Sequence, residues 1–147
     1  MTIRTSIAAA GAAVVLAGAG AVLVPAIASA HSTTHTLKFT AVSLKQANFS
    51  KTSGGGADQD VNSAGKIVGF DVTNFRFDPK TNTGSLNVAL STKGGILYGA
   101  LKPSNGPTIK GTVTGGTGAF QGATGTIVAK QLNKAGTKTA VTITYSS

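Results

Sequence analysis

From residue 35 onwards, hydrophobic and polar side chains alternate with a period of two along most of the chain. The segments 37–41, 85–91, 109–114 and 141–145 show this clearly, with Leu, Val, Ile or Phe at one parity and Thr, Lys or Ser at the other. The spacing typical of an amphipathic helix is absent from this part of the sequence. Such alternation is typical of antiparallel strands that turn one face to a core and the other to water.

Turn-forming residues divide the alternating region into eight expected strands. Gly, Pro, Asn, Asp and Ser gather at 52–56, 78–82, 93–95, 103–107 and 133–136. The expected strands are 35–42, 45–51, 64–77, 83–92, 95–102, 107–115, 123–132 and 137–146. This pattern predicts an all-β domain, either a two-layer sandwich or an antiparallel up-and-down β-barrel. Closure removes exposed strand edges, which favours the barrel.

The first thirty residues have the layout of a secretory signal peptide. Arg4 lies in a short basic start, residues 7–24 are apolar, Pro25 ends that run, and Ala28-Ser29-Ala30 supplies small residues for cleavage. We therefore expect a signal-peptide helix at 1–30, cleavage between Ala30 and His31, and one secreted, extracellular domain at 31–147. The alternative is an uncleaved membrane anchor, because the apolar run approaches spanning length.

The composition excludes several functions. The chain has no cysteine, so neither disulfides nor thiol chemistry is available. Its formal charge is +9, but the lysines are scattered and Arg76 is the only arginine after residue 30. Base reading and phosphate recognition favour clustered arginines and stacking aromatics, so we expect no nucleic-acid partner. The basic surface is expected to keep the protein in solution and to attach it loosely to anionic cell surfaces.

A glycine-rich stretch at 115–125 carries the most specific motif of the chain. A phosphate-binding loop would need Gly-x-Gly-x-x-Gly or a terminal Lys-Ser/Thr before a helix. Here Gln121 stands where the third glycine belongs, and a strand pattern follows at 126–129. The glycines are therefore interpreted as positions where the backbone makes a tight bend between two strands.

The segment 58–145 resembles the allene oxide cyclase/dirigent β-barrel family, here as a bacterial secreted member. The match includes the family's Gly-Gly-Thr-Gly-x-aromatic stretch together with a downstream Ala and Gly. The matching residues are Gly115, Gly116, Thr117, Gly118, Phe120, Ala123 and Gly125. Two weaker matches are the segments 65–69 and 86–99, which occur in the family's order.

The resemblance implies an eight-stranded antiparallel barrel around a cavity for a small hydrophobic or phenolic molecule. It also implies a homo-oligomer, a trimer or a dimer. Family members cyclise an unstable epoxide or steer the coupling of phenolic radicals, without a redox centre of their own. Whether this chain is an enzyme stays open; an isomerase would need an ionisable group in the cavity. The alternative is a non-catalytic structural or cell-surface adhesion module on the same scaffold.

The chain contains no glutamate and four aspartates, of which Asp71 is the candidate catalytic acid. Asp71 shares its strand parity with Thr73 and Phe75, so its side chain can project among apolar groups with a raised pKa. The other parity of this strand is also apolar, which indicates a bulge or an outer face covered by another subunit. A surface position is the alternative for Asp71. Asp58 and Asp60 are expected in a solvated glycine-rich loop.

Four aromatic residues are the candidate ligand contacts: Tyr98, Phe70, Phe75 and Phe39. Packing in the core is the alternative for the phenylalanines. A tyrosine at a barrel mouth can donate a hydrogen bond to an oxygen of the ligand.

The two histidines, His31 and His35, lie at the start of the expected mature chain. Four residues of extended strand span about 13 Å, too far for both imidazoles to bind one ion. We therefore expect an unliganded tail, with no metal site and no cofactor.

Overall fold

The computed structural model describes residues 32–104 and 106–147. These residues form eight antiparallel strands that pair in chain order and close on themselves, β1 with β8. The expected barrel is therefore confirmed and the sandwich excluded. The expected signal peptide lies outside the described residues, as do its cleavage site between Ala30 and His31 and the alternative of a membrane anchor.

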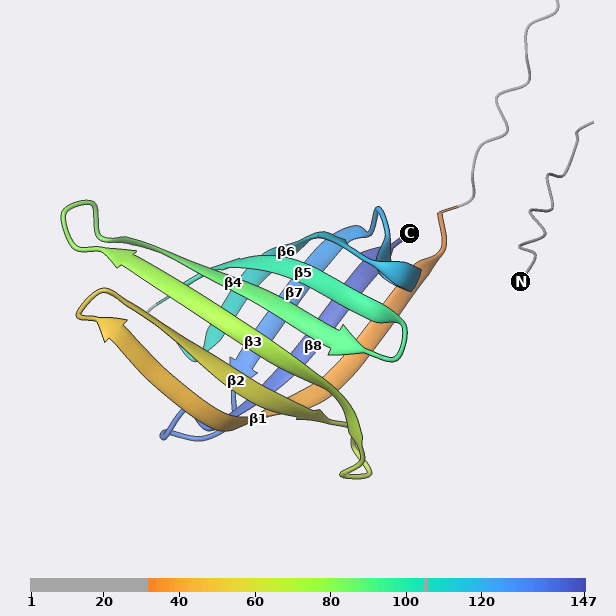
Figure 1. Cartoon of the computed structure of the whole chain (residues 1–147), viewed down its shortest axis with the longest axis horizontal. Coiled ribbons are helices and arrows are strands. Elements are labelled where there is room, and N and C mark those ends of the chain that lie inside the picture. The colour runs from red at the N-terminus through yellow and green to blue at the C-terminus, as the bar shows by residue number, and fades with distance from the viewer. Residues whose placement is uncertain (1–31, 105) are drawn as a thin grey trace, which may run out of the picture. The chain divides into compact units, whose positions relative to one another are not determined.

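The strands follow one another round the barrel (Figure 1). Their bounds are β1 Thr34–Ser50, β2 Ser53–Val61, β3 Ile67–Asp78, β4 Thr83–Thr92, β5 Gly95–Lys102, β6 Thr108–Gly116, β7 Thr124–Gln131 and β8 Lys138–Ser146. A short 3₁₀ turn, η1 Gly118–Phe120, lies between β6 and β7. Among the described residues, no helix is both long and apolar enough to cross a membrane.

Two of the expected strands are one strand in the structure. β1 runs from Thr34 to Ser50, pairs with β8 through its first half and with β2 through its second half. The register with β2 shifts between Ser43 and Lys45, so that Leu44 is an extra residue on β1. Such a bulge bends a strand, and it lies where β1 passes from one neighbour to the other.

The glycine-rich segment expected to be a loop is strand β2. Gly54, Gly55 and Gly56 lie opposite Phe75, Asn74 and Thr73 of β3. A Cβ atom at Gly54 would lie 2.6 Å from the ring of Phe75 and from the carbonyl oxygen of Ala47. Glycine is therefore needed here for close approach of the neighbouring chain rather than for a turn.

The hydrophobic core lies at one end of the barrel. Leu97, Leu101, Val113, Ile127 and Ile143 point inward from β5 to β8 and are buried together with Phe120 and Tyr145. The rings of Phe120 and Tyr145 meet edge to face with their centroids 5.4 Å apart. Phe120 belongs to η1, so the turn between β6 and β7 closes this end of the barrel.

Candidate functional site

The barrel contains a cavity of about 270 Å³ beside this core. Its walls come from all eight strands, and residues of the β5–β6 and β7–β8 connections (Ser104, Pro107 and Gly136) lie at its mouth. An eight-stranded barrel has room for about one small ligand. The cavity therefore suits a single compact molecule.

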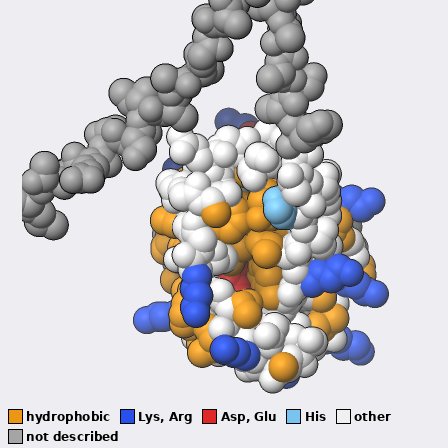
Figure 2. Space-filling view, turned by 90° about the vertical axis from the view of Figure 1, so that its right-hand side faces the viewer, with side chains coloured by type: hydrophobic (Ala, Val, Ile, Leu, Met, Phe, Trp, Pro, Cys, Tyr) orange, Lys and Arg blue, Asp and Glu red, His pale blue; other side chains and the backbone are white. Residues whose placement is uncertain are grey.

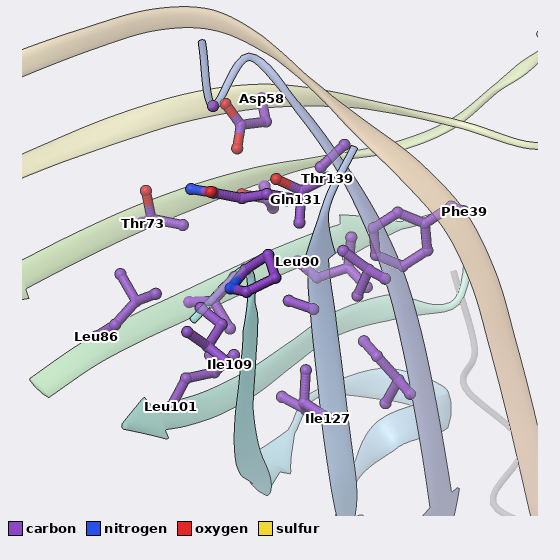
Figure 3. A pocket seen from close by; sticks show the side chains of 18 of the residues that line it. Phe39, Asp58, Thr73, Leu86, Leu90, Leu101, Ile109, Ile127, Gln131 and Thr139 are labelled. Carbon is purple, nitrogen blue, oxygen red and sulfur yellow. The ribbon is translucent and has the colours of Figure 1, made fainter. Parts of the chain in front are cut away.

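The cavity has a polar wall and an apolar wall (Figure 3). The polar groups of Asp58 (β2), Thr73 (β3), Gln131 (β7) and Thr139 (β8) lie on one side. The apolar side chains face them from the other side: Leu86, Leu101, Ile109 and Ile127. A bound molecule can therefore bury an apolar body and keep one polar group in contact with hydrogen-bonding side chains.

Three aspartates converge on the inside of β2 and β3. Asp58 lies directly opposite Asp71 in the strand register, and Asp60 lies opposite Gly69. Asp60 is 0% exposed and Asp71 is 5% exposed. Apart from a hydrogen bond between the carboxyl groups of Asp60 and Asp71 themselves, both carboxylate oxygens of Asp60 and the Oδ1 atom of Asp71 are buried without a hydrogen-bond partner among the described residues. Buried polar groups normally have partners, so this cluster calls for an explanation.

Burial holds these carboxyl groups in their protonated forms at unusually high pH. It raises the pKa of Asp71 to about 8, and the neighbouring charges of Asp60 and Asp58 add to the rise. Burial likewise raises the pKa of Asp60 to about 6. The pKa of Asp58 is also raised by burial, and a hydrogen bond with Ser43 partly offsets the rise. At neutral pH Asp71 therefore keeps its proton and can donate it, while an ionised Asp60 accepts.

No basic side chain balances these acids inside the cavity. Among the residues that the structure describes, none of those lining the cavity is Lys, Arg or His. All eleven lysines of the region 32–147 are exposed. The charge of any ionised aspartate in the cavity is thus left without a counter-ion from the protein.

A second pocket opens at the end of the barrel opposite the cavity mouth, beside the β2–β3 and β4–β5 turns and at the same end as η1. Asp60, Leu37 and Gly69 line it, and three lysines contribute to its border: Lys38, Lys66 and Lys93. Figure 2 shows the face on this side of the molecule, with hydrophobic side chains around a hollow, an acidic side chain within it and basic side chains at the margin. Phe39 and Leu90 line both the cavity and this pocket. They separate the two openings.

The structure brings two of the expected site residues together. Asp71 points inward, as its strand parity predicts, and Phe39 lies in the same cavity. Phe75 lies farther along β3, in a groove with Phe77 outside this cavity. No bulge interrupts the pairing of β3 with β4, so inward and outward residues alternate without a break from Gly69 to Asp78.

Phe70 and Tyr98, expected to contact the ligand, lie outside the cavity in the structure. Phe70 is 50% exposed and Tyr98 is 41% exposed, and neither lines the cavity. Both have the outward parity of their strands, opposite to Asp71 and Leu97. With Val72 and Ala89 they form an exposed apolar patch, in which Ala89 lies opposite both Val72 and Tyr98.

Asp58 and Asp60 are site residues that the sequence did not reveal. Three glycines precede them, and this composition is typical of a solvated loop. Their spacing of two residues carried the signal, because residues i and i+2 of a strand point to the same face. His35 begins the expected strand 35–42, and the structure places it within β1 and not in a free tail; its ring stacks on Tyr145 with the centroids 5.2 Å apart.

The glycine motif supports the closed end of the barrel rather than the cavity. Gly115 and Gly116 end β6, Gly118 begins η1, and Gly125 lies in β7. Thr117 accepts a hydrogen bond from the backbone of Ile96 on its side-chain oxygen and donates one from its own backbone to the Ile96 carbonyl. These bonds tie the turn to β5. The motif residues Phe120 and Ala123 are buried there.

No protein-family model matches the chain, and no curated protein matches it either. Solved structures do match. A protein described as pyocyanin demethylase aligns with a TM-score of 0.63 at 16% identity, over 76% of this chain and 99% of the other. The Diels-Alderase AbmU from Streptomyces koyangensis aligns with a TM-score of 0.61 at 11% identity, over 82% of this chain and 71% of the other.

The pterocarpan synthase dirigent protein GePTS1 aligns with a TM-score of 0.58 at 17% identity, over 78% of this chain and 88% of the other. The chain has the fold of the dirigent and Diels-Alderase barrels. The resemblance to allene oxide cyclase/dirigent barrels is thus confirmed for the fold. Identities this low leave the activity to be argued from the cavity itself.

Proposed function

We propose that the barrel binds one small, largely apolar molecule in its cavity and steers its cyclisation or coupling. The observation that carries this proposal is a closed barrel whose cavity combines an apolar wall with the buried carboxyl group of Asp71. Holding a flexible molecule in a reactive conformation can contribute about 7–11 kcal/mol to the barrier reduction. Such a protein needs few reacting side chains.

In this proposal Asp71 is the acid of the site. Its proton lies within a water-poor cavity and can be donated to a carbonyl, ether or hydroxyl oxygen of the ligand as charge develops there. Burial of carboxyl groups is costly, and strongly shifted pKa values concentrate at functional sites. The reaction class is an isomerisation or a guided coupling, for which the chain itself supplies no oxidant.

Binding can be tested with a fluorescent apolar probe and a variant that fills the cavity. Ala129 lines the cavity on β7, whereas Ala140 points outward from the neighbouring strand β8. We expect Ala129→Leu to weaken probe binding at least about tenfold, because the added side chain occupies ligand space. Ala140→Leu is the matched control and should leave binding unchanged. Equal binding by both variants would place the probe outside the cavity and overturn the proposal.

A second candidate function is a structural or cell-surface adhesion module on the same scaffold. The exposed apolar patch of Phe70, Val72, Ala89 and Tyr98 favours it, since large apolar patches mark interaction surfaces. This function predicts that an apolar probe binds without sensitivity to Ala129→Leu, and that Phe70→Lys lowers binding to polymers or cells.

We further propose that the protein acts outside the cell, on the strength of the residues 1–30, and that its lysines associate loosely with anionic cell surfaces. Amino-terminal sequencing of the exported protein tests the first point. A first residue of His31 supports it, and a chain that keeps Met1 contradicts it.

A further inference from the structure

The cavity wall carries carboxyl groups, and no basic side chain among the described lining residues balances their charge. Asp58 and Asp71 line it, and Asp60 lies behind Asp71 on the same side of the barrel. Three of the four acidic residues of the chain are therefore gathered within a few residues of two adjacent strands. Two basic residues lie on these strands or in the turn that joins them: Lys66 borders the second pocket, and Arg76 is exposed with the outward parity of β3.

An unsatisfied oxygen marks where a ligand group would fit. Asp71 is more than nine-tenths buried, it lines the cavity, and its Oδ1 atom has no hydrogen-bond partner among the described residues other than the neighbouring carboxyl group of Asp60. Asp58 faces it across the strand pair, and Thr73, Gln131 and Thr139 complete the polar wall (Figure 3). This wall offers carboxylate, hydroxyl and amide oxygens to a donor.

We propose that the natural ligand carries a basic nitrogen, which binds as a cation between the carboxyl groups of Asp58 and Asp71 while its apolar body packs on the opposite wall. The inference rests on the binding part of the proposed function and specifies its substrate class. With a cationic ligand, Asp71 acts as a carboxylate that holds the ligand in place, and it does not donate a proton to it. An ammonium group donates several hydrogen bonds and accepts none, so it suits a wall rich in acceptors. Its charge also offsets the crowding of three carboxyl groups.

The shape of the cavity fits such an amphiphilic cation. The ring of Phe39 and the side chains of Leu101, Ile109 and Ile127 provide the apolar surface. The volume of about 270 Å³ limits the body to a compact ring system or a short branched chain. A carboxylate ligand is disfavoured, because it would add a further negative charge to the cluster.

Binding of the cation is coupled to a proton. In the free protein at neutral pH, Asp71 holds a proton beside Asp60. When an ammonium group binds, it keeps its own protons, and the proton of Asp71 leaves to solvent. The groups that face Asp71 are Asp58 and Asp60 from β2, uncharged Leu90 from β4, and Gln131 and Thr139 across the cavity. Only the aspartates among them titrate.

The test compares three ligands that share one ring. Cyclohexylmethylamine is a cation, cyclohexylmethanol is neutral and cyclohexanecarboxylate is an anion between pH 6 and pH 9. Titration calorimetry at pH 8 should show the amine binding at least about tenfold more tightly than the alcohol, with the carboxylate weakest. The affinity for the amine should rise with pH below about 8, approaching about tenfold per pH unit, because deprotonation of Asp71 accompanies binding.

Buffers that differ in ionisation enthalpy report the released proton directly. At pH 7 the amine should release close to one proton per site, and the alcohol none. Asp71→Asn should reduce the amine's affinity to that of the alcohol and abolish proton release. Asp58→Asn provides a second variant that keeps the Asp60–Asp71 pair. It should lower the affinity for the amine and leave the affinity for the alcohol unchanged. Asp78→Asn is the matched control, because Asp78 is the remaining aspartate and lies exposed at the end of β3.

The outcomes separate this inference from the proposed function. Equal or tighter binding of the alcohol, with no proton release by the amine, overturns the basic-nitrogen ligand and leaves the proposed cavity function standing. Failure of all three ligands and of the apolar probe contradicts both. Preference for the amine that persists in Asp71→Asn and Asp58→Asn would assign the cation to the protein surface and overturn the inference.

Discussion

At the scale of single residues, the barrel is unusual for the acids it buries. Asp60 and Asp71 lie on the inner faces of adjacent strands, and among the described residues their buried oxygens have no hydrogen-bond partner beyond each other. An uncharged residue of similar size would avoid the cost of burying a carboxyl group. The cluster therefore indicates a functional role, because it lowers the stability of the folded protein.

This cost predicts a pH-dependent stability with a definite sign. The pKa of Asp71 is about 8 in the folded protein, above the ordinary value of 3.8. The folded state therefore holds this proton more tightly than the unfolded state. The resulting stabilisation is fully present below about pH 4 and is lost as the pH rises through 8; Asp60 behaves likewise up to about pH 6.

We therefore expect the melting temperature of the wild type to fall between pH 5 and pH 9. Asp71→Asn should flatten this fall and should raise the melting temperature at pH 9 by roughly 5 °C. Calorimetry or circular dichroism measures both. Asp78→Asn should keep the wild-type slope, because hydrogen bonding with the backbone of Lys80 lowers the pKa of Asp78. Parallel curves for wild type and Asp71→Asn would show that Asp71 is not buried in its protonated form.

At the scale of elements, η1 and its glycines close one end of the barrel. Gly118 has a φ of +60°, and a Cβ atom there would collide with the carbonyl oxygen of Gly94. The same carbonyl accepts a hydrogen bond from Ala119 at 2.8 Å. The turn and the β4–β5 connection are therefore held together where glycine is required.

We expect Gly118→Ala to lower the free energy of unfolding by about 1–3 kcal/mol, through backbone strain and the displaced Gly94 carbonyl. Chemical denaturation measures the loss. Gly106→Ala serves as its control, because a Cβ atom at Gly106 meets nothing within 4 Å. Similar stabilities for the two variants would contradict the assigned role of η1.

The sequence predicts elements well where side chains alternate and poorly where they do not. Strands β4 to β8 follow from alternating Leu, Val and Ile, and their bounds agree within a few residues. β2 was missed because Gly54, Gly55 and Gly56 show no alternation. β1 was divided because the bulge at Leu44 interrupts its pattern. Phe70 was misplaced because both faces of β3 are apolar, and sequence alone does not say which one is covered.

At the scale of the whole molecule, the outer face of the described barrel carries an exposed apolar patch over β3, β4 and β5. Phe70, Val72 and Tyr98 are exposed on β3 and β5, whereas the lysines are spread over the surface. Monomeric proteins rarely expose contiguous apolar patches of large area. The patch therefore predicts self-association, in line with the dimer or trimer that the family resemblance implies.

Analytical ultracentrifugation should show an oligomer of the wild type and a monomer of Phe70→Lys, since a buried lysine in the contact is costly. Val128→Lys is the control, because Val128 is an exposed apolar residue on β7, outside the patch. A monomeric wild type, or an oligomer unaffected by Phe70→Lys, would contradict assembly through this face.

Carbon-13 NMR titration of the four aspartate carboxyls, with and without cyclohexylmethanol as a neutral cavity ligand, tests the central claim most directly. We expect one carboxyl that titrates near pH 8 and one near pH 6, assigned by Asp71→Asn and Asp60→Asn. It also predicts that the ligand shifts the Asp71 signal and leaves Asp78 unchanged. Four carboxyls that all titrate below pH 5, with no response to the ligand, would contradict a barrel that keeps a protonated acid inside a binding cavity.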